Sequence, residues 1–424
     1  MYSNIRAIKS VLLHIPDILT YNSIFRSKYM LHMDKILISQ MWNIRQPSIN
    51  HLRKCNVSNF SICSQSKTKN TTNDGEKKTI NASIYRKEGK FNSKTLLAEH
   101  LRKNIIFNDI EGSGLIAINK PFGLGLLAGD NEDISLTCAL PELASALEVQ
   151  NLSVIKSSGK FISGCTLLNA GGEKTHKHVS NCINRHQANK QLGTKYLAIT
   201  NGIPRTSGKL ETVDVSLEKI KTKKSLKGGD FKEPVIHREL VSKTRLQKFQ
   251  RKSNDAKHQQ INRFTVLAEI LAKSRGNLTA LVSIQPTGIQ WNFMCAYMAN
   301  LLSPIIGDSQ FSYRVKTLFG QQVKVSHESS PVGNASSGLP RSIMGQLGMS
   351  MNDVNHIPVH LHHFRTHLPG FYGKENLNIY APVPKYFEYS VNALEISVDF
   401  KAIETKDQIF DISQHKNGTA NEIL

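Results

Sequence analysis

Short apolar runs bounded by Gly, Pro and Asn recur along the chain from residue 115 to residue 391. Such runs are typical of strands, whereas apolar residues spaced three and four positions apart are typical of helices. The pattern predicts strands in LIAINK (115–120), KYLAITNGIP (195–204), GKLETVDVSL (208–217), FTVLAEILA (264–272), LTALVSIQP (278–286), HIPVHLHHFRTHLPG (356–370) and IYAPVPKYFEYSV (379–391).

Apolar residues at helical spacing mark four further segments. NSKTLLAEHLRKNII (92–106) has Ser93 as a candidate cap. One face of this helix is expected to carry Leu96, Leu97, Leu101 and Ile105. The other helices are expected in SLTCALPELASALEV (135–149), in a polar His- and Lys-rich segment beyond residue 168, and in WNFMCAYMANLL (291–302).

Two turn signals indicate how the strands are connected. Asn201-Gly202 is expected to turn the chain towards a partner strand at 208–217, and Gly276-Asn277 to join 264–272 to 278–286. The sequence contains no internal repeat. Strands that arrive mostly as hairpins with helices between them indicate the α+β class.

Residues 1–80 differ from the rest in composition. Up to Asn73 the acids are Asp17 and Asp34 alone, against ten Lys and Arg, and apolar residues are interspersed with these bases. An acid-poor, basic and amphipathic start is typical of a mitochondrial transit peptide. The alternative is a disordered basic arm without a targeting role.

A second basic stretch interrupts the region of predicted strands and helices. Residues 219–263 carry 14 Lys and Arg against four acids, with little apolar periodicity, so we interpret them as a flexible basic insertion. Residues 327–345 are rich in Ser, Gly and Pro and are expected to form a loop.

The net charge of +21 is the strongest global signal. Such an excess attracts polyanions, of which nucleic acid and anionic lipid are the obvious ones. No apolar run approaches the roughly 18 to 20 residues that span a bilayer, so nucleic acid is favoured. Aromatic residues expected to be exposed, Tyr196, Phe311 and Tyr313, also favour RNA or DNA binding.

Few residues point to metal, redox or phosphate-loop chemistry. The six cysteines (Cys55, Cys63, Cys138, Cys165, Cys182 and Cys295) include no CxxC pair, so reduced thiols are expected. LGLLAG (124–129) matches neither GxGxxG nor a P-loop and is interpreted as a turn.

Two histidine clusters leave alternatives open. His178, Cys182 and His186, with His176 nearby, would share a helical face and could hold zinc or lie in solvent. In the second cluster, His360 and His362 would share one face of a strand. That cluster, which also contains His363 and His367, could hold a metal or a phosphate, or form a half-buried sheet.

Five motifs in this order resemble the RluA-type pseudouridine synthases. They are INKPFG (118–123), KYLAITNGIP (195–204), QPTG (285–288) with the following helix and PIIGD (304–308), VHLHHFRTHLPG (359–370), and YAPVPKYF (380–387). The resemblance extends from about Leu115 to Tyr389, interrupted by the basic insertion. The residues of these motifs are most similar to those of the mitochondrial mRNA pseudouridine synthase subgroup. This similarity agrees with the transit-peptide composition.

The resemblance implies a fold, a ligand and a domain plan. The fold is α+β and pseudouridine-synthase-like, with a large mixed, mainly antiparallel sheet flanked by helices. The ligand is uridine-containing RNA, and the isomerisation needs neither a cofactor nor a metal. The plan is a transit peptide and basic arm (1–80), a first half of the domain (81–218), the insertion (219–263), a second half (264–395) and a C-terminal tail (396–424).

One loop departs from the family at its catalytic residue. VIKSSGKFISG (154–164) occupies the place of the family's His-Arg-Leu-Asp-X-X-Thr-Ser-Gly loop, whose Asp is essential. Aligning Ser163-Gly164 with the end of that motif puts Gly159 at the Asp and Lys156 at the His. A carboxylate can act as nucleophile or base while uracil is detached and rejoined through C5, and glycine can do neither.

Two further positions depart together. After Thr287-Gly288 the family usually has Arg, where this chain has Ile289. The Arg that pairs with the catalytic Asp falls at about Met294. Losing both partners is self-consistent, because a buried Arg without its carboxylate would be an unpaired charge. Tyr196 stands at the family's base-stacking tyrosine and either holds a flipped uridine or is a core residue.

We therefore expect a catalytically impaired RNA-binding protein of the mitochondrial matrix that acts in mitochondrial RNA or ribosome maturation. Its partners would be mitochondrial mRNA or rRNA and other RNA-processing proteins. Its expected RNA contacts are Lys120, Lys156, Lys160, Lys195 and Arg314. The alternative is an active synthase that uses another carboxylate, for which Glu148 and Glu173 are nearest in sequence. A metal-dependent enzyme built on the histidines is a third hypothesis.

Overall fold

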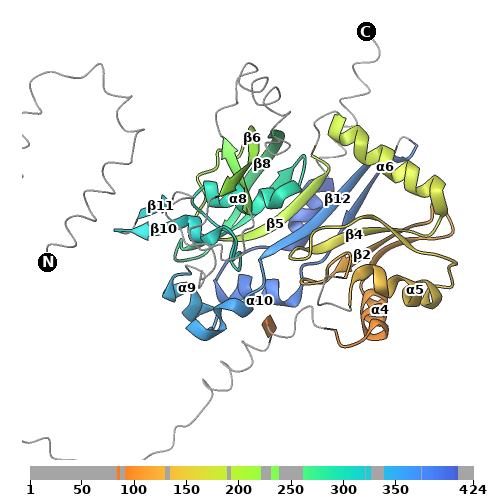
Figure 1. Ribbon diagram of the computed structural model, residues 1–424, viewed down its shortest axis with the longest axis horizontal. Coiled ribbons are helices and arrows are strands. Elements are labelled where there is room, and N and C mark those ends of the chain that lie inside the picture. Colours follow the sequence, from red (N-terminus) through yellow and green to blue (C-terminus); the bar gives the residue numbers. More distant parts are fainter. Residues whose placement is uncertain are drawn as a thin grey trace, which may run out of the picture. The chain divides into compact units, whose positions relative to one another are not determined.

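One large sheet organises the part of the chain that the computed structural model describes, namely residues 84–85, 91–128, 134–188, 192–220, 231–237, 261–319, 321–325, 339–373 and 375–408 (Figure 1). The strand order is β1-β2-β4-β12-β5-β9-β8-β6-β7, with β3 paired to β4 and β13 to β12. Among the described strands only β12 and β4 run parallel. The α+β class with a large, mainly antiparallel sheet is thus confirmed.

The strands of this sheet are β1 Ile105–Asp109, β2 Leu115–Lys120, β3 Ser153–Lys156, β4 Ser163–Asn169, β5 Thr194–Asn201, β6 Leu210–Ile220, β7 Phe231–His237, β8 Ile261–Lys273, β9 Thr279–Pro286, β12 Leu361–Tyr372 and β13 Glu375–Tyr380. A separate two-stranded sheet is formed by β10 Val315–Leu318 and β11 Gln321–Lys324. The α-helices are α4 Lys94–Lys103, α5 Leu136–Ala146, α6 Gly172–Ala188, α8 Phe293–Asn300, α9 Arg341–Gln346 and α10 Lys385–Ala393, with a further helix over 400–408. Short 3-10 helices are η4 Gln290–Asn292, η5 Ser312–Arg314 and η7 Met351–His356.

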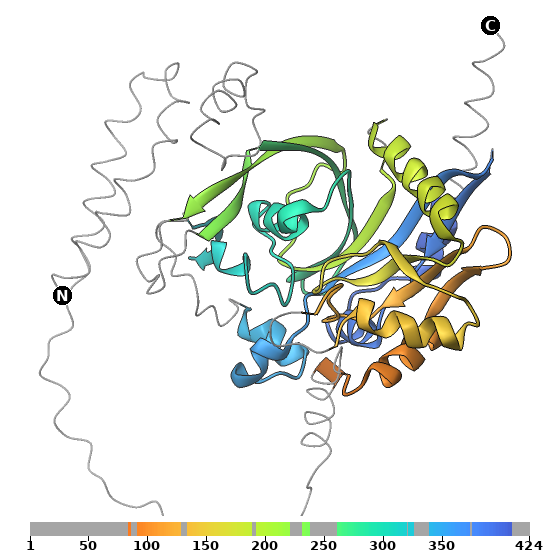
Figure 2. The same ribbon diagram turned by 45° about the vertical axis from the view of Figure 1, so that its right-hand side comes forward.

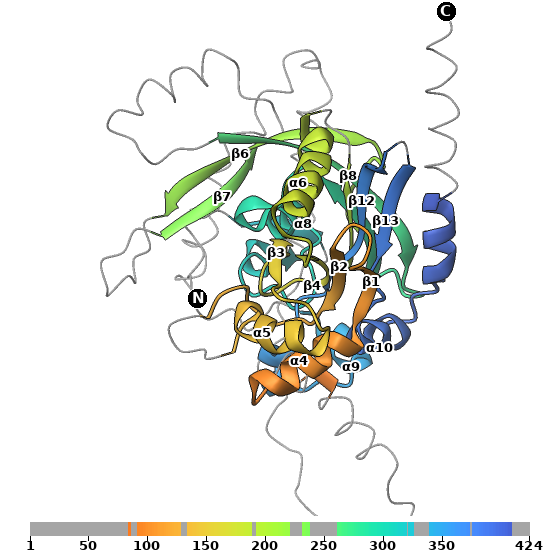
Figure 3. The same ribbon diagram turned by 90° about the vertical axis from the view of Figure 1, so that its right-hand side faces the viewer.

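Helices cover both faces of the sheet. In β5, Tyr196 and Ala198 pack into the apolar cluster that contains α8, whereas Leu197 and Ile199 pack into the cluster that contains α10. This alternation is the period of two expected of a strand buried on both sides. Strands β6, β8 and β9 curve around α8 (Figure 2), and α6 lies on the opposite side of β12 from α10 (Figure 3).

The cap of α4 was predictable from the sequence. The Ser93 side chain accepts a hydrogen bond from the Leu96 backbone N–H at 3.1 Å, which confirms the predicted cap of α4. Leu97 and Leu101 are buried as expected, but Leu96 is exposed and Ile105 belongs to β1. The predicted hairpin of β8 and β9 also forms.

Two strand predictions were wrong. Strand β6 was expected to pair with β5, but it pairs with β8 and β7, because the β8–β9 hairpin inserts between them. The segment KYFEYSV, expected to be extended, lies entirely in α10, where Tyr386, Phe387, Ser390 and Val391 recur on one buried face. Aromatic and β-branched residues suggested a strand, but tertiary packing overrides that weak preference.

The basic insertion 219–263 is partly ordered. Within it, β7 pairs with β6 along its whole length, and Pro234 and Ile236 are buried. The interpretation as a flexible segment is therefore wrong for residues 231–237, where a short apolar strand lies between runs of charge. Residues 219–220 end β6 and residues 261–263 begin β8, whereas residues 221–230 and 238–260 and the predicted transit peptide lie outside the described residues. The predicted loop 327–345 includes the start of α9.

The predicted C-terminal tail contributes to the core. Ile403, in the helix over 400–408, is buried in the same apolar cluster as α10. Asp407 forms ion pairs with Lys195 of β5 and Arg365 of β12. Within the described residues, no helix is both long and apolar enough to cross a membrane.

Candidate functional site

The site is built around the loop that joins β3 to β4. Gly159 lies at its exposed turn, where the Ile162 N–H donates to the Gly159 carbonyl at 3.1 Å. The INKPFG motif holds this turn, because the Gly123 N–H donates to the Lys160 carbonyl at 2.9 Å. The Lys120 ammonium donates to the Gly159 carbonyl at 3.3 Å. The two sequence motifs therefore form one structural unit.

Space is available at the position aligned with the family's Asp. A Cβ added to Gly159 would meet no atom within 4 Å, and its φ lies outside the left-handed region. Glycine is thus not required there by packing or by backbone conformation. Met294 of α8 and Ile289, the positions aligned with family arginines, belong to the apolar cluster on that face of the sheet.

Histidines of β12 bind serines of the loop. The His362 Nε2–H donates to the Ala381 carbonyl at 2.9 Å, so its Nδ1 accepts from the Ser163 hydroxyl at 3.0 Å. His363 is held by a serine in a similar way, because its Nδ1 lies 3.1 Å from the Ser158 hydroxyl oxygen. Burial lowers the pKa of His362 to about 4 and that of His363 to about 3, so both rings are neutral at physiological pH.

His360 and His362 of the second histidine cluster are fully buried. His360 and His362 do share one face, against Phe387. His360 is held by Ser390, at 2.6 Å from Nε2 to Oγ. Across the described ranges no three His, Cys, Asp or Glu side chains lie close enough to hold a metal ion. The first cluster also departs from a solvated face, because Cys182 and His186 are buried.

Tyr196 lies in the core. It is fully buried, and its ring stacks on that of His363, with centroids 4.6 Å apart. Burial raises the pKa of its hydroxyl. Phe311 is also buried, so the expectation that both aromatics are exposed is wrong. Alternation along a strand cannot reveal whether a helix covers the second face of the sheet, and here α8 does.

The predicted RNA-contacting cations fall into two groups. Lys120, Lys195 and Arg314 are almost fully buried, so their charges are not available to a phosphate in this conformation. Burial lowers the pKa of Lys120 to about 7 and that of Arg314 to about 10. Lys156 and Lys160 are partly exposed and lie at the two sides of the loop.

An exposed aromatic lies beside Lys160. Phe161 is 56% exposed, and the Lys160 ammonium is 5.7 Å from its ring centroid. Phe122 of INKPFG is a second neighbour of Phe161, with ring centroids 5.9 Å apart. The sequence analysis did not single out Phe161. An apolar residue at the tip of a glycine-flanked turn, next to Lys, was the available signal.

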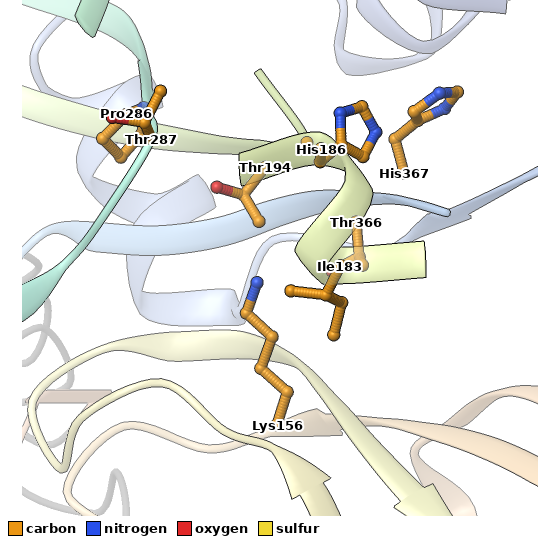
Figure 4. A pocket seen from close by; sticks show the side chains of 9 residues that line it. Lys156, Ile183, His186, Thr194, Pro286, Thr287, Thr366 and His367 are labelled. Atoms are coloured by element: carbon orange, nitrogen blue, oxygen red, sulfur yellow. The ribbon is translucent and has the colours of Figure 1, made fainter. Parts of the chain in front are cut away.

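Lys156 faces a small pocket of about 330 Å³, open solvent at its mouth included. Figure 4 shows its side chain directed from β3 towards Thr194, with Ile183 of α6 beside it. The remaining lining residues are His186 of α6, Gly193 just before β5, Pro286 of β9 with Thr287 after it, and Thr366 and His367 of β12. The pocket thus brings the loop and the QPTG motif together.

Buried carboxyl groups lie elsewhere. Asp308 of PIIGD accepts the Gln310 and Phe311 N–H groups, and burial raises its pKa to about 6. Glu148 and Glu173, the alternatives nearest in sequence, are exposed. The four described cysteines, Cys138, Cys165, Cys182 and Cys295, are free thiols, as expected.

Comparison with known proteins gives a consistent result. No family model matches the chain. The chain is 29% identical over 304 residues to the mitochondrial mRNA pseudouridine synthase Rpusd3 of Mus musculus, covering 71% of this chain and 80% of the relative. It is 27% identical over 325 residues to the mitochondrial pseudouridylate synthase RPUSD4 of Danio rerio, covering 72% and 77%.

A solved structure, human RNA pseudouridylate synthase domain containing 4, is similar at 20% identity with a TM-score of 0.49, covering 72% of this chain and 98% of that one. By sequence similarity, the homologues of this chain are mitochondrial pseudouridine synthases.

Proposed function

We propose that this chain is an RNA-binding protein of the mitochondrial matrix that is impaired in uridine isomerisation. It would act in the maturation of mitochondrial mRNA or rRNA, beside other RNA-processing proteins. The observation that carries this proposal is Gly159. In a loop otherwise bound to INKPFG and to β12, this residue offers no carboxylate where the aligned motif requires one.

The surroundings of Gly159 agree with an impaired site. The side chain that contacts its carbonyl belongs to Lys120, beside the backbone N–H of Ile162, and the positions aligned with arginines hold Ile289 and Met294. The pocket beside the loop is lined by Lys, Thr and His, with no carboxylate among its lining residues. The exposed positions of Glu148 and Glu173 give no support to an active synthase that uses either of them.

RNA binding would rest on Lys156, Lys160 and Phe161. A base can stack on an exposed aromatic ring, a contact that contributes about 1–3 kcal/mol per base. The neighbouring ammonium groups supply charge to the backbone phosphates. Tyr196 would take part only if it left its stack on His363.

The decisive experiment is pseudouridine formation by the purified full chain on mitochondrial RNA, with an RluA enzyme as positive control. We expect no turnover together with salt-sensitive RNA binding. Turnover would contradict the impairment, and the loss of turnover in Asp308→Asn would then identify a different carboxylate. Absence of both turnover and RNA binding would contradict the proposed function itself.

A further inference from the structure

The Lys156 pocket, defined by the nine lining residues given above, has the composition of an anion site. Its lining combines an ammonium group, three threonine hydroxyls and two imidazoles. It contains no Asp or Glu. Such a set donates hydrogen bonds and carries positive charge, which is the requirement for binding a phosphate group.

Lys156 has no acidic partner within the part of the chain that the structure describes. Among the described residues no carboxylate forms an ion pair with its ammonium, and burial lowers its pKa. The titratable groups around it are Cys165 of β4 and His363 of β12, both neutral at physiological pH because burial shifts their pKa values. A partly buried cation without an anion is costly, and a bound anion would remove that cost.

The hydroxyls are placed to supplement this charge. Thr287 Oγ1 accepts the Thr265 N–H at 2.9 Å, which leaves its hydroxyl proton for another acceptor. Thr194 lies opposite the Lys156 ammonium in Figure 4. The Thr366 hydroxyl already donates to Cys165, so its proton is not available to a ligand and the residue only lines the pocket.

We propose that the Lys156 pocket binds one phosphate group of the RNA. This inference rests on the proposed function, because the pocket adjoins the loop that would bind the nucleotide. Lys156 lies three residues before Gly159, and Thr287 belongs to QPTG. A phosphate next to the bound uridine would be fixed by Lys156 while Phe161 contacts a base.

The test measures how binding of a short uridine-containing RNA by the full chain depends on salt. The variants are Lys156→Gln and Lys156→Arg, with Lys174→Gln as the matched control. Lys174 is exposed on α6, which borders the pocket, but does not line it. We expect Lys156→Gln to reduce the slope of log K against log salt by about 0.7, the value for one phosphate on a single strand. Lys156→Arg and Lys174→Gln should keep a steeper slope than Lys156→Gln.

An unchanged slope in Lys156→Gln would overturn the proposal even if the wild type binds RNA, and the proposed function would then survive it. A parallel titration with inorganic phosphate identifies the source of the ligand. Binding of phosphate that Lys156→Gln weakens at least tenfold, without any RNA binding by the wild type, would mean a free phosphate site and would overturn the RNA assignment.

Discussion

Gly164 couples the loop to β12 through its backbone. Its φ of +111° lies in the region that favours glycine, and a Cβ there would lie 2.3 Å from the His363 carbonyl oxygen. The glycine of the Ser-Gly pair at the end of the loop is thus required by close packing against β12. Gly159, five residues earlier, has neither constraint.

We therefore predict that Gly164→Ala destabilises the protein by about 3 kcal/mol or more, whereas Gly159→Ala has little effect. Urea unfolding of both variants measures the difference. Equal midpoints for the two variants would contradict the packing argument.

Restoring catalysis should need two changes. The carboxylate introduced by Gly159→Asp has room, but the position aligned with its cationic partner holds buried Met294. We predict that Gly159→Asp alone forms no pseudouridine and that adding Met294→Arg gives measurable turnover. Nucleoside analysis of treated RNA provides the readout, and activity from the single change would show that the partner is unnecessary.

At the scale of elements, three buried neutral histidines lie in β12 and at the residue just before it. Burial lowers the pKa values of His360 and His362 to about 4 and of His363 to about 3. An unfolded histidine binds its proton near pH 6.5, so between pH 6.5 and these lower values the unfolded state takes up more protons. The stability associated with the neutral rings is therefore present above pH 6.5 and is lost as the pH falls towards 4.

This predicts a loss of about 2 kcal/mol per histidine between pH 7.5 and pH 5. Thermal unfolding across this range should show a falling Tm, and His360→Gln should make the fall shallower. A Tm that is flat from pH 7.5 to pH 5 would mean that these rings accept protons without unfolding.

Ion pairs hold the helix over 400–408 against β5 and β12. Asp407 contacts Lys195 and Arg365, both almost fully buried. Burial lowers the pKa of Lys195 more than this ion pair raises it, so its charge depends on the carboxylate. Removing one partner of a buried ion pair is costly because the other charge remains buried.

We predict that Asp407→Asn destabilises the protein by about 3–5 kcal/mol. Glu99→Gln, which removes the exposed ion pair of Glu99 with Lys103, should leave stability nearly unchanged. Denaturant unfolding compares the two. If both variants unfold at the wild-type midpoint, the pairing with Asp407 contributes nothing.

The sequence predicted the positions of helices and strands better than it predicted which strands pair. Caps and turn residues act locally, so α4 and the β8–β9 hairpin could be found from Ser93 and Asn277. The pairing of β6 depends on a distant hairpin, and local patterns carry no information about it. For the site, the alignment placed the loop, but the burial of Lys120 and Lys195 depends on residues far away in the sequence, such as Asp407.

At the scale of the molecule, β12 joins the two halves of the sheet, because it lies between β4 and β5. We predict that a chain ending at residue 360 does not fold, whereas one ending at residue 408 does. Circular dichroism and limited proteolysis distinguish these states. A cooperative unfolding transition in the shorter chain would show that the halves associate without β12.

The position of β12 also has a consequence for how the protein is made. Synthesis proceeds from the N-terminus, so β4 and β5 emerge long before the strand that pairs with both of them. Until residue 372 has emerged, the facing edges of these two strands stay open to pairing with other chains. Completion of the sheet is therefore a late event in the life of the nascent chain, and the two open edges persist while the segment between β5 and β12 is synthesised.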